Sequence, residues 1–157
     1  DYLTVKDEVI DTSAPVRYVD PLKYWKNRCF EDCTFNVSGD NYNVWTWASK
    51  EITFSNCTFN SDGKALLLYT EGNGTINMNV QKCTFNDNDG LTAKKAAIEI
   101  GDSPYGTPTY NVNITNTVVN GYDINPDGLD TGTSLWGNKN SMPADRLNIK
   151  VDGVNVY

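Results

Sequence analysis

Five segments of this chain repeat one pattern of apolar residues. They span residues 28–35, 52–59, 78–85, 112–119 and 149–156. Each has apolar residues at its first, third and eighth positions and a small residue at its sixth, and only Arg28 departs from this pattern. The two residues before the sixth position break the alternation of a plain strand, which indicates a strand followed by a corner. Such self-similarity predicts a repeat architecture, in which each unit buries its apolar face against the next.

The intervals between repeats lengthen along the chain. The small position falls at Cys33, Cys57, Cys83, Thr117 and Val154. The shorter intervals suit one coil of a parallel β-solenoid, and the longer ones require insertions at 102–110, 122–130 and 137–145. Because crossovers between parallel strands favour the right hand, we predict an all-β, right-handed parallel β-helix of about five coils over residues 28–157. Residues 1–27 lack the repeat and are expected to cap the first coil, whereas the last coil has no cap.

A second type of strand recurs between the repeats, at 43–48, 65–70, 96–101 and 134–138. Alternation around Glu99 turns Ile98 and Ile100 inward. Aligned on these two residues, the inward positions of the other segments are Trp45, Leu67 and Trp136 at one level and Trp47, Tyr69 and Asn138 at the next. Two neighbouring tryptophans would crowd a narrow core, so an outward position for Trp45 and Trp47 stays open.

The cysteines are predicted to be free. Cys33, Cys57 and Cys83 share one repeat position and should stack in the interior, where cysteine acts as a small hydrophobe. Coils spaced about 4.8 Å apart lie near the lower limit of the Cα separation for a disulfide. Cys29 aligns with Thr53 and should point outward. The chain has no histidine and no second cysteine pair, which argues against a zinc site.

One column of asparagines is also predicted. Asn36, Asn60, Asn86 and Asn120 each follow the last apolar residue of a repeat. Stacked on successive coils, their amides can hydrogen-bond from one coil to the next, as in cross-β stacks.

Composition narrows the classes of partner. The chain has 157 residues, suggesting one domain, and a net charge of −7 without a basic stripe. Nucleic acid and anionic membrane are therefore poor partners, whereas a neutral glycan, a cationic ligand or a metal ion is electrostatically easier. No apolar run is long enough to span a membrane.

One loop resembles the start of a calcium-binding loop. Asp123, Asn125 and Asp127 place oxygen side chains at alternate positions, and a glycine follows. The twelfth position of that motif should be acidic and is Ser134, so Asp130 would have to supply the missing ligand in a different geometry. A calcium site and an Asx-rich surface turn both remain open.

Three carboxylates are the candidates for catalysis. Glu71 and Asp102 align at the end of the second strand, one coil apart, and Glu99 lies close by. Stacked strands could hold such a pair at the separation that glycoside hydrolysis needs. The alternative is that outward carboxylates keep the sheet soluble. A Ser–His–Asp triad is excluded because the chain has no histidine.

Aromatic side chains are the candidates for binding sugars. Tyr105, Tyr110 and Tyr122 lie on or beside the insertions, and Trp136 lies on a second-type strand. Insertions in repeat folds project from one face, often the binding face. Exposed single aromatics are also common without a function.

The repeated sequences DCTFN, NCTFN and KCTFN, with ALLLYT and AAIEIG between them, resemble right-handed parallel β-helix proteins of the pectin-lyase-like superfamily. They look most like repeat modules of surface or secreted proteins of gut-type bacteria. The resemblance covers about residues 26–157 and implies the fold and an extracellular location. None of the enzymes' catalytic signatures is matched, so the resemblance assigns no site residue.

We therefore expect a non-enzymatic extracellular module that acts in adhesion or glycan binding on a bacterial surface. A carbohydrate-active enzyme of the same superfamily, a polysaccharide lyase or a glycoside hydrolase, is the second hypothesis. The third is a structural spacer, or a piece that oligomerises through its C-terminal coil. Calcium is the one cofactor considered.

Overall fold

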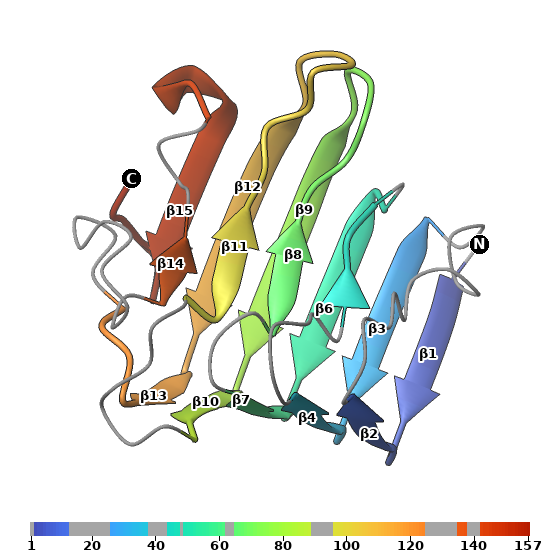
Figure 1. Ribbon diagram of the computed structural model, residues 1–157, viewed down its shortest axis with the longest axis vertical. Coiled ribbons are helices and arrows are strands. Elements are labelled where there is room, and N and C mark those ends of the chain that lie inside the picture. The colour runs from blue at the N-terminus through green and yellow to red at the C-terminus, as the bar shows by residue number, and fades with distance from the viewer. Residues whose placement is uncertain are drawn as a thin grey trace.

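The computed structural model describes residues 2–12, 26–37, 44–47, 49–61, 65–88, 96–124, 135–137 and 142–157. Their strands form three sheets around one core (Figure 1). Sheet A contains, in spatial order, β1 (Tyr2–Lys6), β3 (Asn27–Glu31), β6 (Glu51–Ser55), β9 (Thr75–Gln81), β12 (Thr109–Thr115), β15 (Leu147–Val151) and β16 (Val154–Asn155). Sheet B contains β2 (Val9–Thr12), β4 (Thr34–Val37), β7 (Thr58–Ser61), β10 (Thr84–Asp87) and β13 (Val118–Asn120). Sheet C contains β5 (Val44–Trp45), β8 (Leu66–Leu68), β11 (Ile98–Ile100) and β14 (Trp136–Gly137).

The chain winds repeatedly from sheet A to sheet B, then to sheet C and back to sheet A. Within the described residues every strand pair is parallel except β15 with β16. Equivalent repeat positions stack directly, so Phe35 lies opposite Phe59 and Phe59 opposite Phe85. The predicted parallel β-helix is confirmed.

The predicted corner is a single residue in the left-handed region. It occurs between the sheet A strand and the next strand at Asp7, Asp32, Asn56, Lys82, Asn116 and Asp152, with φ between 48° and 57°. Asp and Asn adopt this conformation more readily than other non-glycine residues. Lys82 is the one corner residue among these six that lacks this preference.

We expect Lys82→Asn to stabilise the protein by about 0.5 to 1 kcal/mol, because it relieves the left-handed strain at that corner. Urea unfolding measures the change. Lys50→Asn, at a site with ordinary φ, is the control and should leave the free energy of unfolding nearly unchanged. Equal effects at the two sites would contradict this explanation.

The core consists of stacked columns of like residues. Phe30 stacks on Phe54 with ring centroids 5.2 Å apart. In a second column, Phe59 lies 4.9 Å from Phe35 and 4.6 Å from Phe85. The two columns contact each other edge to face, an arrangement that aromatic quadrupoles favour.

The cysteine column is buried and the four cysteines are free, as predicted. Each ladder thiol donates to a carbonyl of the preceding coil: Cys33 to Val5, Cys57 to Phe30 and Cys83 to Phe54. Burial raises the pKa of the Cys33 thiol. The pKa of the Cys57 thiol is raised by its hydrogen bond with the Cys83 thiol and, second, by burial. Cys29 pairs with Thr53 in register, as predicted, but it is buried on this side of the sheet, with 8% of its surface exposed.

The asparagine column is also confirmed. Amide groups of sheet B link each coil to the one before it: Asn36 to Asp11 (2.6 Å), Asn60 to Asn36 (2.9 Å), Asn86 to Asn60 (2.9 Å) and Asn120 to Asn86 (2.8 Å). The column therefore crosses the five strands of sheet B.

In sheet C, β5 and β8 differ from the predicted register by one residue, whereas β14 pairs with β11 as predicted. Ile98 lies opposite Leu66, and Leu66 opposite Val44, so Leu67 and Trp45 share the outer face with Glu99. The predicted inward position of Leu67 was wrong, and of the two positions left open for Trp45 the structure shows the outward one. Ile98, Ile100 and Trp136 are buried as predicted. A slip of one residue reverses every side chain in a strand. Val44 and Leu66 are as apolar as their neighbours, so hydrophobicity alone did not distinguish the two registers.

Both ends of the stack differ from expectation. Residues 2–12 form the parallel strands β1 and β2, so the described part of the N-terminal segment is a further copy of the repeat rather than a cap across the end. At the other end, β16 folds back antiparallel on β15. Val154 is therefore 63% exposed and does not continue the cysteine column.

Arg28, the one exception to the repeat, lies inside the core. It is 1% exposed and donates to the backbone carbonyls of Trp45 (3.4 Å) and Trp47 (3.0 Å). Burial lowers the pKa of its guanidinium to about 10. Its partners are main-chain oxygens of the second-type strand, which explains how a charged group occupies an apolar position.

No helix in the described residues is long and apolar enough to cross a membrane.

Candidate functional site

The insertion at 102–110 stacks on the loop of the preceding coil. Gly72 N donates to Tyr105 O (2.8 Å) and Thr109 N to Gly74 O (3.1 Å). The Asn73 side chain accepts from both the amide and the hydroxyl of Thr107 (3.0 and 3.2 Å). Figure 1 shows these loops side by side beyond β8 and β11. The insertion is therefore hydrogen-bonded to the loop of the preceding coil and does not project as a free loop.

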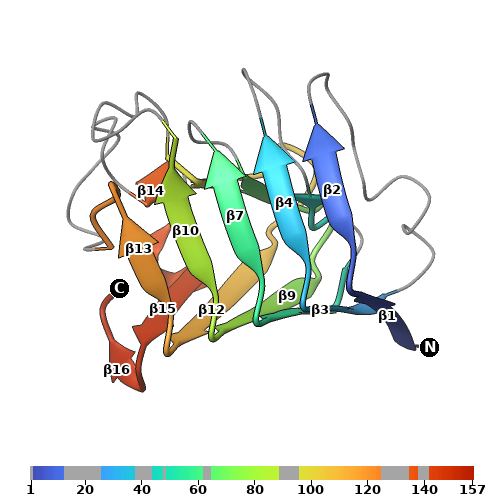
Figure 2. The same cartoon turned by 90° about the horizontal axis from the view of Figure 1, so that it is seen from below.

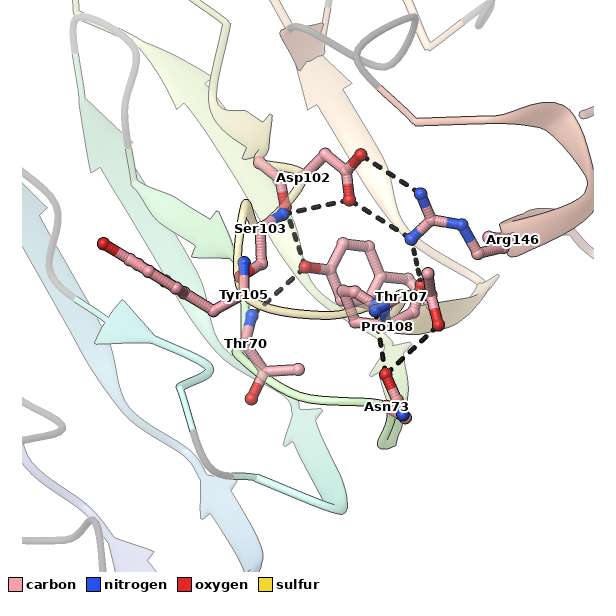
Figure 3. A network of polar contacts seen from close by, with 10 residues as sticks. Thr70, Asn73, Asp102, Ser103, Tyr105, Thr107, Pro108 and Arg146 are labelled. Carbon is pink, nitrogen blue, oxygen red and sulfur yellow. Dashed lines mark hydrogen bonds and ion pairs between the residues drawn. The ribbon is translucent and has the colours of Figure 1, made fainter.

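Asp102 forms a two-point ion pair with Arg146. The guanidinium donates to both carboxylate oxygens at 3.1 Å and to Pro108 O at 2.9 Å (Figure 3). Arg146 belongs to the 3₁₀ turn η3 (Ala144–Arg146). The pair ties the last coil to the insertion.

The three candidate catalytic carboxylates do not form a pair in register. Ile100 lies opposite Leu68, so this register places Asp102 level with Thr70 rather than with Glu71. Asp102 is held by Arg146, and Glu71 accepts a hydrogen bond from the Tyr69 hydroxyl (3.3 Å). Glu99 points to the outer face of sheet C, beside Leu67. Both oxygens of the Asp102 carboxylate are therefore engaged by Arg146.

Three of the four predicted sugar-binding aromatics are buried. Tyr110 and Trp136 are fully buried and Tyr122 is 7% exposed. The Tyr122 hydroxyl donates to Ser61 O (3.0 Å), and Trp136 Nε1 to Ile124 O (3.0 Å). These rings fill the core, so they offer no face to a ligand, and their predicted binding role does not fit the structure. Tyr105 is 70% exposed and points away from the polar network in Figure 3.

Tyr110 anchors the base of the insertion. Its hydroxyl donates to Gly101 O (2.7 Å) and accepts from Thr70 N (3.1 Å). Burial raises the pKa of this phenol to about 12, above its ordinary value near 10.

This raised pKa predicts an alkaline instability. The folded state retains the proton that the unfolded state loses, so the stabilisation is complete below about pH 10 and is lost as pH rises towards about 12. The loss amounts to about 2 to 3 kcal/mol. Urea unfolding from pH 9 to 12 should show a steeper decline for the parent than for Tyr110→Phe. Parallel declines would contradict the assignment.

The predicted calcium loop lies largely outside the described residues. Asn125, Asp127 and Asp130 are not among them, and the Asp123 carbonyl accepts from Leu135 N (2.7 Å). Over the parts of the chain that the structure describes, no group of three potential metal ligands occurs. The calcium site remains a prediction.

Sequence reasoning missed a second asparagine column, on the outer face of sheet A. Asn111 donates to Asn77 (3.0 Å) and Asn148 to Asn111 (2.9 Å), across β9, β12 and β15. The signal was present, because each of these residues precedes the first apolar position of its repeat.

A hollow of about 580 Å³ lies over this second column. Its lining consists of Glu51, Asn77, Asn79, Asn111, Val112, Asn113, Asn148, Lys150 and Asn155. A neighbouring hollow of about 530 Å³ shares Asn77 and is lined by Lys26, Lys50 and Glu71 among others. The first hollow is rich in amide side chains and runs across the strands of sheet A, and we call it the asparagine groove.

The sheets and their register define the protein as a parallel β-helix with a polar groove on one outer face. Comparison with protein-family models, curated proteins and solved structures finds no match to this chain.

Proposed function

We propose that this protein is a non-enzymatic glycan-binding module, and that the asparagine groove binds an extended, uncharged glycan. The observation that carries this proposal is the groove lining, in which six asparagines occur with one valine, one glutamate and one lysine. The resemblance to the pectin-lyase-like superfamily and an extracellular location on a bacterial surface belong to the same proposal.

The amides of the column retain hydrogen-bonding capacity for a ligand. An asparagine side chain has two N–H donors and an oxygen with two lone pairs. A bond to the next coil uses one N–H of the donor and one lone pair of the acceptor. Each coil can therefore still offer a donor and an acceptor, which suits sugar hydroxyls because each hydroxyl can do both.

The column also holds these groups in place. Asn111 is fixed on both sides, since it donates to Asn77 and accepts from Asn148. Fixing side chains before binding lowers the entropic cost of association. Neighbouring coils present the same group about every 4.8 Å, so a chain of similar units lying along the helix axis would meet a repeating set of contacts.

The charge of the groove favours a neutral ligand. Glu51 and Lys150 line it with opposite charges, and the whole chain carries a net charge of −7. A polyanion would meet a net repulsive field at long range. Glycans rich in hydroxyls and without acid groups avoid that repulsion.

The test is an array of neutral plant, microbial and mucin glycans, followed by calorimetry with soluble oligosaccharides of the positive class. Asn111→Leu should weaken binding about tenfold or more, since it removes hydrogen bonds worth about 1 kcal/mol each or more. Asn60→Leu is the matched control, because it interrupts the other asparagine column in the same way. An empty array, or equal weakening by both variants, would overturn the proposal.

A further inference from the structure

The outer face of sheet B is a two-column array of side chains that are uncharged except for Asp11. One column contains Val9, Thr34, Thr58, Thr84 and Val118. The other, two residues further along each strand, contains Asp11, Asn36, Asn60, Asn86 and Asn120. The intervening Phe35, Phe59 and Phe85 point inward and are fully buried. Figure 2 shows the five strands lying side by side.

The array is rigid and regular. Each asparagine is bonded to the residue on the preceding coil at 2.6 to 2.9 Å. The threonines and valines are β-branched, which restricts their side-chain rotamers. Both columns repeat with the spacing of parallel strands, about 4.8 Å.

Charged residues are rare on this face, although they are common in the chain as a whole. The chain has 13 basic and 20 acidic residues, and among the ten outward positions of sheet B only Asp11 is charged. Sheet A of the same protein tolerates charge between neighbouring coils, since Lys6 and Glu31 pair at 3.8 Å. Val9 and Val118 are 66% and 55% exposed. The face can therefore lose water without desolvating a row of charges.

We infer that the outer face of sheet B docks on the surface of a solid, uncharged polysaccharide. In such a solid the hydroxyls are already ordered, as are the threonine hydroxyls and asparagine amides of the face. Two preordered surfaces lose little conformational entropy when they meet. The face carries one charged residue, Asp11 at its first strand, so its other nine outward positions match the absence of charge on the polysaccharide. This site is distinct from the asparagine groove and does not depend on it.

The test measures depletion of the whole chain from solution by microcrystalline cellulose and by chitin powder. We expect saturable binding to at least one, and a tenfold or greater loss in Thr58→Lys, which places a charge at the centre of the face. Thr53→Lys makes the same change on sheet A and should bind like the parent. If circular dichroism shows that Thr58→Lys is unfolded, Thr58→Ser should still lower binding several-fold.

Each of the following results would overturn the inference. They are no binding to either solid, equal loss in Thr58→Lys and Thr53→Lys, and a Thr58-dependent dimer in light scattering, which would show that a second copy occupies the face. Adsorption to ice crystals in place of the polysaccharides would also overturn it. Binding of soluble oligosaccharides is measured separately, and its loss in Asn111→Leu with retained binding to solids would identify two independent sites.

Discussion

Phe59→Ala should destabilise the protein by about 4 to 5 kcal/mol, the upper range for a buried phenylalanine. Its ring is fully buried and stacks on Phe35 and Phe85, and it contacts Phe54 edge to face at 5.3 Å. Removing it opens a cavity inside a column and interrupts ring contacts on three sides. The free energy of unfolding in urea gives the change directly.

Phe59→Leu is the matched control, because it keeps an apolar side chain and most of the volume. We expect a cost near 1 to 2 kcal/mol, in line with hydrophobic replacements that nearly conserve volume. A loss below about 1 kcal/mol for Phe59→Ala would show that the columns do not hold the coils together.

Gly106→Ala should cost about 2 to 4 kcal/mol or displace the insertion. Gly106 has φ +135°, and a Cβ there would lie 2.4 Å from the carbonyl oxygen of Gly72. That contact is with backbone, so no side-chain rotation relieves it. We expect faster hydrogen exchange at Gly72 N and Thr109 N, whose bonds join the two loops.

Substitutions at two other glycines distinguish the steric clash from the backbone strain as the cause of the lost stability. Gly74→Ala meets no atom within 4 Å and has an ordinary φ, so it should change stability little. Gly72→Ala is also sterically open but has φ +82°, so it should cost about 1 kcal/mol from backbone strain alone. Equal effects at Gly74 and Gly106 would contradict the close approach of the two loops.

The sequence was sufficient for features that depend on period alone. The cysteine and sheet B asparagine columns could be predicted because identical residues recur at one repeat position, and parallel stacking then brings them together. Cys57, which directly precedes β7, and Asn60, which lies within β7, are examples. The N-terminal copy was missed because Glu8 stands where the other copies have a small residue.

Features that depend on contacts between distant residues could not be predicted. Asp102 looked like a free carboxylate, yet its partner Arg146 lies 44 residues away. Tyr110 and Tyr122 looked like surface aromatics beside insertions, but their hydroxyls find backbone carbonyls inside the core. A tyrosine can be buried once its hydroxyl has a partner, and the partner is visible only in the fold.

The candidate site itself was only partly accessible from sequence. The aromatic candidates lie on or near the insertions, whereas the groove is built largely from asparagines at recurring positions of the sheet A strands. Asn77, Asn111 and Asn148 occupy equivalent places in three successive repeats. The polar positions that recur from one repeat to the next therefore predict contacts, as the recurring apolar positions do.

The most direct test of glycan binding in the asparagine groove is the dependence of affinity on ligand length. The groove crosses β6, β9, β12 and β15. In calorimetry with oligosaccharides of the array-positive class, affinity should rise with each added sugar until the ligand spans these four strands, and then become constant. A single sugar that binds as tightly as the longest oligosaccharide would contradict the account.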